Sequence, residues 1–537
     1  MDEESTAGPD EESTAGPDEE STAGPDEEST AGPDEESTAG PEQRDLTTEE
    51  LAEKRKGATI WSFVMTGGQS VLRIVMQLIL AALLGPEAFG LLALALVYVM
   101  LVQILLDQGM GTAIIQRQNL ESSHLDSGFW MLIGLSTVLT MGAIAGAGLW
   151  ADFQREPDLE LIVIVLSLLI PFRALTVVQE AVLKRELDYK SLAIRGNLAL
   201  AVSGVVGITA ALMGAGVWAL VYEQLANAGA ELIVLWSVST WRPRWRFSKR
   251  HARELLSFSI GTFMGAAGVF ALTRGEALIV GRYFGTTSVG LYRFAWRIVY
   301  SVIELVVNPL QNVAFSVLSR LQDDREAFAE SLLDTLRTAS IMLIPVMGVV
   351  AGAGPDLLST VGEEWEPATP ALLLLCVYGV ASVATLVVPP TLAALGHPFR
   401  LAGWVWGIAI VALSSLTVIG FTFEDDTIER QLIAIAAANV GVFALVGGIS
   451  GLVVVSKHTG ITLRRLMEPL GRPIVAGLVA FGVVAGANWV GVSAIDAPFI
   501  RLLITGTTGT VVAGLALVAV DPTARGYATS GLEKVRG

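Results

Sequence analysis

Cysteine is almost absent from this sequence, and charged residues are few for its length. Cys376 is the single cysteine among 537 residues, which excludes an intrachain disulfide and any metal cluster held by several cysteines. Only 16% of the residues are charged, whereas a soluble domain carries roughly 25%. Because 52% of the residues are hydrophobic and the mean hydropathy is +0.57, the composition indicates a protein that resides in a membrane.

Several kinds of functional motif are missing as well. The sequence has no GxxxxGK[ST] loop to cradle ATP and no HExxH motif to bind zinc. The longest predicted cytoplasmic connection within the hydrophobic part, near residues 240–254, is too short for a catalytic domain. Four histidines fall in predicted cytoplasmic loops and are more typical of interfacial residues than of metal ligands: His124, His251, His397 and His458. We therefore predict no metal, no cofactor and no enzymatic activity.

Basic residues are absent from the first 43 positions. Residues 2–41 are five tandem copies of DEESTAGP and hold 15 of the 53 acidic residues, so the net charge of −18 lies mostly in this tail. A segment with no apolar residue larger than alanine buries too little surface to offset the entropy lost on ordering. We predict a disordered acidic tail and a basic juxtamembrane segment over residues 1–56. Repeat expansion without a function explains the tail more simply than a docking arm.

Long apolar runs dominate the rest of the chain. A helix that crosses the bilayer needs about 20 mostly apolar residues. The first run starts near Ile60 and is long enough to be a span, and no cleavable signal peptide precedes it. We predict an all-α polytopic membrane protein with about fourteen transmembrane helices. They lie near residues 59–84, 88–106, 127–149, 159–181, 191–213, 216–239, 255–273, 287–310, 333–353, 369–395, 399–420, 430–455, 473–491 and 499–519.

Basic and acidic loops alternate along the chain. Bases cluster at 54–56, 184–190 and 242–253, whereas intervening loops read ADFQREPDLE, GEEWEPATP and FEDDTIE. Lys and Arg accumulate in the cytoplasmic loops of membrane proteins. We therefore predict a multi-pass protein of the cytoplasmic membrane with both termini in the cytoplasm. The basic loop that contains Trp241 and Trp245 is expected to face anionic lipid headgroups rather than nucleic acid.

A short motif recurs at a spacing of 200 residues. Residues 85–91 read GPEAFGL and residues 285–291 read GTTSVGL, each between two predicted spans. Coincidence is the alternative in a chain with 55 glycines, but the matching position favours a parallel repeat with the substrate path between its halves. The repeat predicts the following division: an N-terminal six-helix lobe at 57–253, a C-terminal six-helix lobe at 254–456, two additional transmembrane helices at 457–520 and a cytoplasmic tail at 521–537.

Polar side chains recur at helical spacing inside the predicted spans. An ionisable group at the centre of a membrane helix costs about 2.5–3.5 kcal/mol on insertion scales, so such groups mark candidate functional sites. Gln69, Arg73 and Gln77 are four residues apart and share one face of the first span. Arg293 and Arg297 share a face of the eighth span, where water or an anion is expected to face them.

Further ionisable groups lie in the fourth and sixth predicted spans. Arg173 and Glu180 are either part of a polar cavity or a structural pair, and Glu223, Asn227 and Glu231 form a stripe that is either functional or a helix face alone. The excess of arginine predicts a cationic cavity between the halves, because a guanidinium fork suits phosphate or a sugar carboxylate. The candidate substrate-binding residues are Arg73, Arg297, Arg293, Gln69, Gln77 and Arg173.

Several stretches together resemble one family of membrane transporters. These are LLGPEAFGLLALALVYVMLVQILLDQGMGTAIIQRQNL at 83–120, VLKRELDYKSLAIRGN at 182–197, IVGRYFGTTSVGLYRFAW at 279–296, VGEEWEPATPAL at 361–372 and ALGHPFR at 394–400. The chain is similar to the polysaccharide transporter (Wzx-type, WzxC-like) family of the multidrug/oligosaccharidyl-lipid/polysaccharide exporter superfamily. The similarity covers roughly residues 57–400, and the last four spans match only in hydropathy.

The resemblance implies a flippase for a polyprenyl-pyrophosphate oligosaccharide, used in surface polysaccharide biosynthesis. It implies two lobes that alternate between inward-open and outward-open states, driven by an ion gradient. It assigns the contact with the anionic substrate to Arg73 and Arg297, and it leaves Glu304 and Glu223 as candidates for ion coupling. The expected partners are the lipid-linked oligosaccharide, membrane lipids, and a polysaccharide polymerase and glycosyltransferases of the same pathway.

Two other functions remain open from the sequence. An ion-coupled small-molecule exporter of the same superfamily would have a smaller cavity, richer in acidic and aromatic residues. A membrane glycosyltransferase or polymerase would need acidic metal-binding motifs and usually a large loop, and neither is visible. A purely structural scaffold is disfavoured, because it would have no reason to keep arginines within the membrane.

Overall fold

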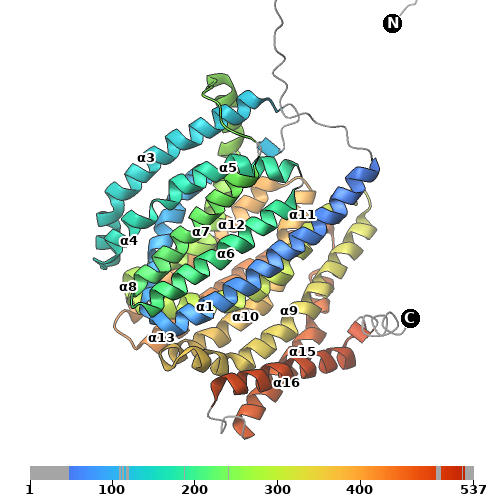
Figure 1. The fold of residues 1–537 in the computed structure, drawn as a ribbon. Helices are drawn as coiled ribbons and strands as arrows, with labels where there is room; N and C mark the ends of the chain where they lie inside the picture. The colour runs from blue at the N-terminus through green and yellow to red at the C-terminus, as the bar shows by residue number, and fades with distance from the viewer. Residues whose placement is uncertain are drawn as a thin grey trace, which may run out of the picture. The chain divides into compact units, whose positions relative to one another are not determined.

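The computed structural model describes residues 48–107, 111, 114–115, 120–186, 188–239, 241–490, 497–522 and 524–525. Within these ranges the fold is all-α, without strands (Figure 1). The predicted acidic repeats and most of the predicted C-terminal tail lie outside the described residues. The helices are α1 (Thr48–Asp107), α3 (Ser122–Gln154), α4 (Leu159–Leu166), α5 (Leu169–Arg185), α6 (Tyr189–Leu212), α7 (Val217–Val238), α8 (Lys249–Leu318), α9 (Arg325–Val361), η1 (Glu363–Ala368), α10 (Thr369–Leu386), α11 (Val388–Ala394), α12 (Pro398–Phe423), α13 (Ile428–Gly441), the π-helical η2 (Val442–Ile449), α14 (Ser450–Thr459), α15 (Leu463–Val490) and α16 (Pro498–Val520).

Eleven helices in the described part of the chain are long and apolar enough to cross a membrane. The helices α1 and α8, each of which joins two helical limbs across a kink, count once each, although each contains two of the predicted spans. Helix α7 is not among the eleven. It carries Glu223, Gln224, Asn227 and Glu231 on 22 residues, which lowers its hydropathy. The polytopic all-α architecture is therefore confirmed, whereas the number fourteen stays a prediction.

The two longest helices bend at glycines that are 200 residues apart. Gly85 in α1 has φ 72° and ψ 173°, and Gly285 in α8 has φ 77° and ψ 178°. A side chain rarely tolerates this backbone conformation, so glycine is the residue that permits the turn. Proline and threonine follow, at positions 86 and 286, and the helix resumes. The repeated motif of the sequence is thus a repeated turn of the backbone.

The two bent helices cross at a second pair of repeat glycines. A Cβ added to Gly90 would overlap the carbonyl oxygen of Thr286, and a Cβ added to Gly290 would overlap the carbonyl oxygen of Pro86. Pro86 and Thr286 occupy the same position in the two copies of the motif. The same contact is therefore made twice, and it brings the N-terminal half of the molecule against the C-terminal half without an intervening side chain.

An aromatic side chain reinforces the junction between the halves. Trp365 of η1 is fully buried, and its indole N–H donates a hydrogen bond to the carbonyl of Ala81 in α1 at 3.2 Å. Its ring packs against Phe89 of α1 and Phe294 of α8, with centroid distances of 5.6 and 4.4 Å. The two halves are therefore joined closely at the end where α1 and α8 turn, the end that the sequence predicts to be external.

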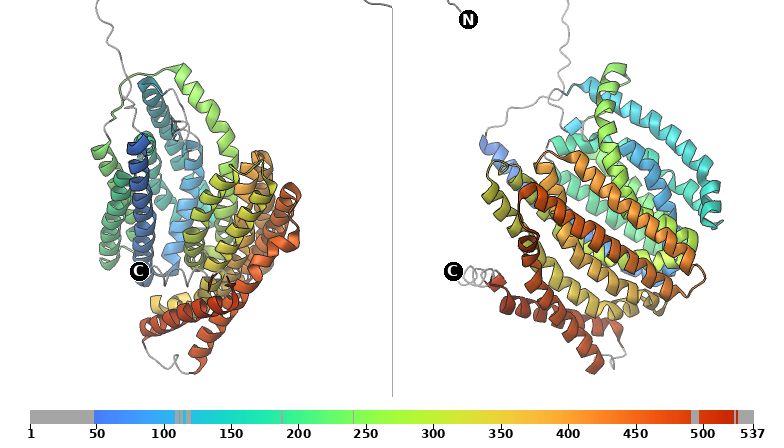
Figure 2. Two further views of the ribbon diagram at one scale, coloured as in Figure 1. Left: turned by 90° about the vertical axis from the view of Figure 1, so that its right-hand side faces the viewer. Right: turned by 180° about the vertical axis from the view of Figure 1, so that it is seen from behind.

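Helices α15 and α16 pack against α9 (Figure 2). Asp356 of α9 is buried, and its carboxylate accepts hydrogen bonds from Asn488 of α15 at 3.0 Å and from Thr505 of α16 at 3.1 Å. Arg501 of α16 lies 3.6 Å from the same carboxylate. One buried acid thus holds both additional C-terminal helices.

The glycine crossing generates a prediction about stability. Replacing Gly90 or Gly290 by Ala forces the backbones of α1 and α8 apart, and overpacking of this kind costs about 1–3 kcal/mol. We expect a lower thermal unfolding temperature for Gly90→Ala and Gly290→Ala, measured on the purified protein in detergent. Gly134→Ala in α3 is the control, because a Cβ there meets nothing within 4 Å. Equal unfolding temperatures for all three variants would contradict the close crossing.

Candidate functional site

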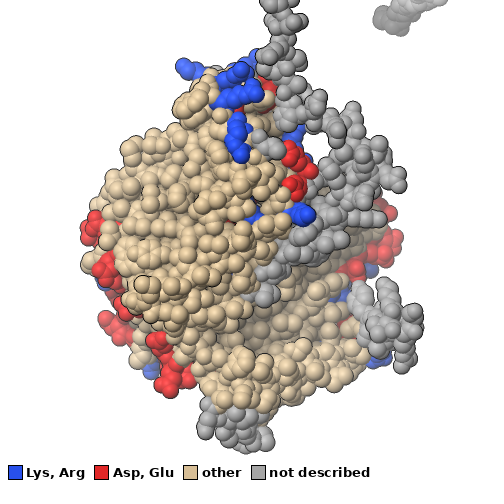
Figure 3. Space-filling model, in the orientation of Figure 1, with Lys and Arg blue, Asp and Glu red and all other residues tan. Residues whose placement is uncertain are grey.

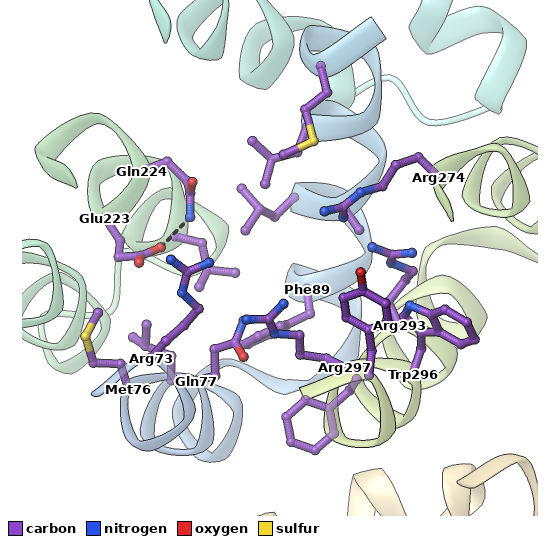
Figure 4. A pocket seen from close by; sticks show the side chains of 18 of the residues that line it. Arg73, Met76, Gln77, Phe89, Glu223, Gln224, Arg274, Arg293, Trp296 and Arg297 are labelled. Atoms are coloured by element: carbon purple, nitrogen blue, oxygen red, sulfur yellow. Dashed lines mark hydrogen bonds between the residues drawn. The ribbon is translucent and has the colours of Figure 1, made fainter. Parts of the chain in front are cut away.

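A cavity of about 400 Å³ lies between the two halves, and α1, α7 and α8 supply most of its wall. Figure 4 shows side chains from these helices converging on one space. The lining residues that carry polar or aromatic groups are Arg73, Gln77, Phe89, Glu223, Gln224, Asn227, Thr273, Arg274, Arg293, Phe294, Trp296, Arg297 and Tyr300. The cavity therefore lies between α1 and α8, the two helices that contain the copies of the repeated motif.

Arginines dominate the charge of this cavity. Arg73 comes from α1, and Arg274, Arg293 and Arg297 come from α8, so both halves contribute. Glu223 is the one acidic residue among the lining side chains. Four guanidinium groups against one carboxylate make the site strongly cationic. An anion with several oxygens could bind more than one of these planar donor forks at once.

One cavity arginine has a donor that is buried and unused. The Nε of Arg297 is inaccessible and has no hydrogen-bond partner among the described residues. Leaving a buried donor of a charged group unpaired is costly. Arg297 is thus a residue whose hydrogen-bonding capacity exceeds what its surroundings in the described chain supply.

The opposite wall is formed by α7 and is polar rather than cationic. The amide of Gln224 donates a hydrogen bond to Glu223 at 2.7 Å. The side-chain oxygen of Asn227 is buried without a partner among the described residues. The polar stripe that the sequence predicts on this span faces the cavity at Glu223 and Asn227, whereas Glu231 does not line it.

A buried acid stands behind the cavity and balances one of its arginines. Glu276 of α8 is 5% exposed, and its carboxylate accepts a hydrogen bond from Arg293 at 3.0 Å. The other oxygen accepts from Tyr292 at 3.3 Å and from Asn439 of α13 at 3.2 Å. Asn439 in turn donates to the Tyr292 hydroxyl at 2.6 Å. Arg293 is therefore fixed at the cavity wall by a partner outside it.

The helix that supplies Asn439 changes its winding directly after that residue. Residues Val442–Ile449 form a π-helix, which is rare and frequently accompanies functional sites. Phe443 in this segment packs against Tyr378 at 4.2 Å, and Tyr378 packs against Trp296 of the cavity wall at 4.8 Å. The cavity wall is thus connected to this π-helical segment through the rings of Trp296, Tyr378 and Phe443.

Three of the predicted site residues lie outside the cavity lining. Gln69 packs against Gly196 of α6, where a Cβ would overlap its amide. Arg173 forms an ion pair with Glu180 at 2.9 Å, the structural alternative that the sequence left open. Glu304 does not line the cavity, although it lies two turns further along α8 from Arg297. Five others do line it: Arg73, Gln77, Arg293, Arg297 and Glu223.

Other lining residues were not among the sequence candidates. Arg274 follows directly after the predicted seventh span at 255–273, and α8 runs on through this point and carries it into the cavity. Gln224 stood next to the predicted polar stripe rather than on it. Its position directly after Glu223 was the one feature of the sequence that could have indicated a place at the cavity. Among the described residues no group of His, Cys, Asp and Glu is suited to hold a metal ion.

Comparison with known sequences finds similarity to proteins of polysaccharide biosynthesis. A family model described as "Polysaccharide biosynthesis protein" matches residues 79–370. The succinoglycan biosynthesis transport protein ExoT of Rhizobium meliloti is 26% identical over 381 residues, which are 71% of this chain and 76% of that protein. The teichuronic acid biosynthesis protein TuaB of Bacillus subtilis is 23% identical over 71% of this chain and 79% of its own length.

Comparison with solved structures shows the fold. The lipid II flippase MurJ in an inward closed conformation superposes with a TM-score of 0.65 at 15% identity, over 86% of this chain and 98% of MurJ. An inward-facing multidrug resistance transporter of the MATE family gives a TM-score of 0.59 at 16% identity, over 73% of this chain and 96% of that chain. At such identities these similarities establish the architecture alone.

The Glu276–Arg293 pair generates a prediction about stability. Glu276→Ala leaves Arg293 partly buried without its acid, and breaking a buried ion pair in this way costs about 3–5 kcal/mol. We expect the double variant Glu276→Ala/Arg293→Ala to be more stable than Glu276→Ala alone, because it removes the uncompensated charge. Thermal unfolding of the single and double variants in a double-mutant cycle measures the coupling.

A surface pair in the same half serves as the control. Arg430 and Asp426 are 3.1 Å apart with side chains 71% and 30% exposed. Asp426→Ala should change stability by less than about 1 kcal/mol, as is usual for exposed pairs. If Glu276→Ala behaves like Asp426→Ala, Glu276 does not act as the counter-ion of Arg293.

Proposed function

We propose, on the premise that the chain belongs to the polysaccharide biosynthesis protein family, that it translocates a lipid-linked oligosaccharide across the cytoplasmic membrane. The family model covers more than half of the chain. The proposed cargo is a polyprenyl-pyrophosphate oligosaccharide for surface polysaccharide biosynthesis. The main observation in support of this proposal is the cavity between the halves, which is lined by four arginines and one glutamate. The protein acts as a transporter, not an enzyme.

A diphosphate group matches this cavity in charge and in hydrogen bonding. Arg73 and Arg297 supply guanidinium groups from opposite halves, and the unpaired Nε of Arg297 offers a further donor. A guanidinium group that is shielded from bulk water attracts a phosphate strongly, because few water molecules compete for its hydrogen bonds. The rings of Phe89, Trp296 and Tyr300 add apolar faces beside the charges, against which a sugar could pack.

The distribution of surface charge supports the proposed orientation. In the view of Figure 3, Lys and Arg gather at the end where α8 begins, and Asp and Glu gather elsewhere on the same face. Because basic residues favour the cytoplasmic side, we place the start of α8 and both termini in the cytoplasm. The glycine crossing and Trp365 then close the external end, and transport requires this closure to alternate with closure of the cytoplasmic end.

The proposal extends to energy coupling and to partners. Glu223 faces the cavity, and Glu304 acts on Arg297 from behind it, so both remain candidates for the carboxylate that couples transport to an ion gradient. A translocated oligosaccharide has to be made on one side of the membrane and extended on the other. Glycosyltransferases and a polysaccharide polymerase are therefore the proposed pathway partners.

The fold also occurs in multidrug transporters, so a small-molecule exporter is the second candidate. The chemistry of the cavity separates the two proposals. An exporter of cationic or apolar drugs would gain nothing from four arginines at the binding site, whereas an anionic cargo requires such charge. We therefore favour the lipid-linked cargo.

Transport in proteoliposomes tests the proposal. We expect the wild-type protein to move a fluorescent polyprenyl-pyrophosphate oligosaccharide across the bilayer, measured by the fraction that an impermeant reagent added outside can reach. Arg73→Ala and Arg297→Ala should each slow transport about tenfold or more, because a hydrogen bond to a charged group contributes about 1.5–3 kcal/mol.

Arg430→Ala is the matched control, since it removes an arginine from the exposed surface. It should transport at the wild-type rate. A folded wild-type protein that fails to move this lipid under both a proton and a sodium gradient would favour the small-molecule exporter. Normal transport by both cavity variants would contradict the assignment of the two arginines.

A further inference from the structure

The described residues of the connection between α7 and α8 form no regular secondary structure, but hydrogen bonds hold them against α3. The backbone N–H of Arg244 donates to the Asp126 carboxylate at 3.0 Å, and the carbonyl of Arg244 accepts from the Trp130 indole at 2.8 Å. The backbone N–H of Ser248 donates to the Ser127 hydroxyl at 2.9 Å. Asp126 and Ser127 are both buried. This connection joins the two halves of the molecule, and its shape is fixed by one of them.

The fixed connection holds two aromatic rings outward. Trp245 is 87% exposed, and yet its ring stacks on Trp130 with centroids 4.1 Å apart and an angle of 24° between the planes. Phe247, two residues on, is 56% exposed. Tryptophan is enriched where membrane meets water, because its large ring is apolar and its N–H is polar. Exposure of these two large rings to water alone would not stabilise the protein.

Three basic side chains surround these rings. Arg244, Arg246 and Lys249 are exposed, and none of them forms an ion pair with an acid among the described residues. Arg242 differs, since its guanidinium turns back to donate to the carbonyl of Trp236 at 2.6 Å and lies over the Trp236 ring. Figure 3 shows Lys and Arg concentrated at this end of the molecule.

We propose that residues 244–249 form a platform that binds the headgroups of anionic phospholipids in the cytoplasmic leaflet. The inference rests on the orientation given under Proposed function. Trp245 and Phe247 would lie at headgroup depth, and Arg244, Arg246 and Lys249 would contact the lipid phosphates. Because Lys249 is the first residue of α8, bound lipid would fix the base of the C-terminal half relative to α3.

The acidic repeats of this chain are the competing occupant. They carry charge opposite to the platform, but their largest apolar side chain is alanine. A segment of that composition could pair with the bases and would leave Trp245 and Phe247 uncovered. The combination of exposed rings with exposed bases therefore favours lipid over the repeats.

Lipid binding to the full-length protein tests the platform without measuring transport. Native mass spectrometry counts bound phosphatidylglycerol and phosphatidylcholine as each lipid is titrated into the detergent-solubilised protein. We expect the wild type to prefer phosphatidylglycerol, with an affinity that falls as salt is raised. The triple variant Arg244→Gln/Arg246→Gln/Lys249→Gln should bind phosphatidylglycerol about tenfold more weakly, because each base near a phosphate contributes separately.

Two comparisons make this result specific. The variant Lys457→Gln/Arg464→Gln/Arg465→Gln removes the same charge from another exposed basic region and should retain the wild-type affinity. Trp245→Ser should weaken binding while keeping its salt dependence, since it removes the ring and not the charges. Equal phosphatidylglycerol binding by the wild type and the platform variant would overturn the proposal. Binding that appears only after residues 1–42 are deleted would instead identify the acidic repeats as the occupant.

Transport of the lipid-linked oligosaccharide separates this inference from the proposed function. In vesicles that contain phosphatidylglycerol we expect faster transport than in pure phosphatidylcholine, and the platform variant should lose this increase while keeping the rate in phosphatidylcholine. Lipid binding at the platform with no transport of the oligosaccharide would reject the proposed function alone. Transport with no difference in lipid binding between the variants would reject the platform alone.

Discussion

The approach of two backbones at Gly90 and Gly290 is the contact on which the arrangement of the two halves depends. Each glycine lies against a carbonyl of the other copy of the motif, so neither position has room for a side chain. The bends at Gly85 and Gly285 direct the helices into this crossing. Beyond it the helices diverge, and the space between them is the arginine-lined cavity. Removing the crossing would therefore alter the cavity as well as the external end.

The cavity remains cationic because Glu223 is the one acid among its lining residues, and the acid that pairs with Arg293 lies behind the wall. Glu276 balances Arg293 from a buried position, held by Tyr292 and by Asn439 of a different helix. The charge of Arg293 is thereby stabilised, and its outward face stays open to a ligand. Within the described residues Arg297 has no acid bonded to it, and its buried Nε has no hydrogen-bond partner. The two arginines share a helix face but differ in how the surrounding protein supports them.

The sequence predicts the fold class and four of the five charged residues that line the cavity, because both follow from local patterns along the chain. Residues four apart share a helix face, so Arg73 with Gln77 and Arg293 with Arg297 were found as pairs. What lies opposite that face depends on tertiary packing. Gln69, on the same stripe as Arg73, meets α6, and Arg173 meets Glu180 rather than the cavity. Arg274 was missed because the continuation of α8 through the predicted loop is not visible in hydropathy. The attachment of α15 and α16 through Asp356 had no local signature either, since its partners are more than 130 residues away.

The contact at the end where α1 and α8 turn also has an electrical consequence. Moving one elementary charge across a membrane potential of 100 mV changes its free energy by about 2.3 kcal/mol, so a cell loses stored energy through any pore that conducts ions. A carrier with room for a large anion risks becoming such a pore. Where Gly90 and Gly290 touch opposing carbonyls, no side chain can rotate to admit a file of water, and Trp365 covers the flank. Passage of water or protons past this contact therefore requires α1 and α8 to move apart, because the two backbones leave no gap between them.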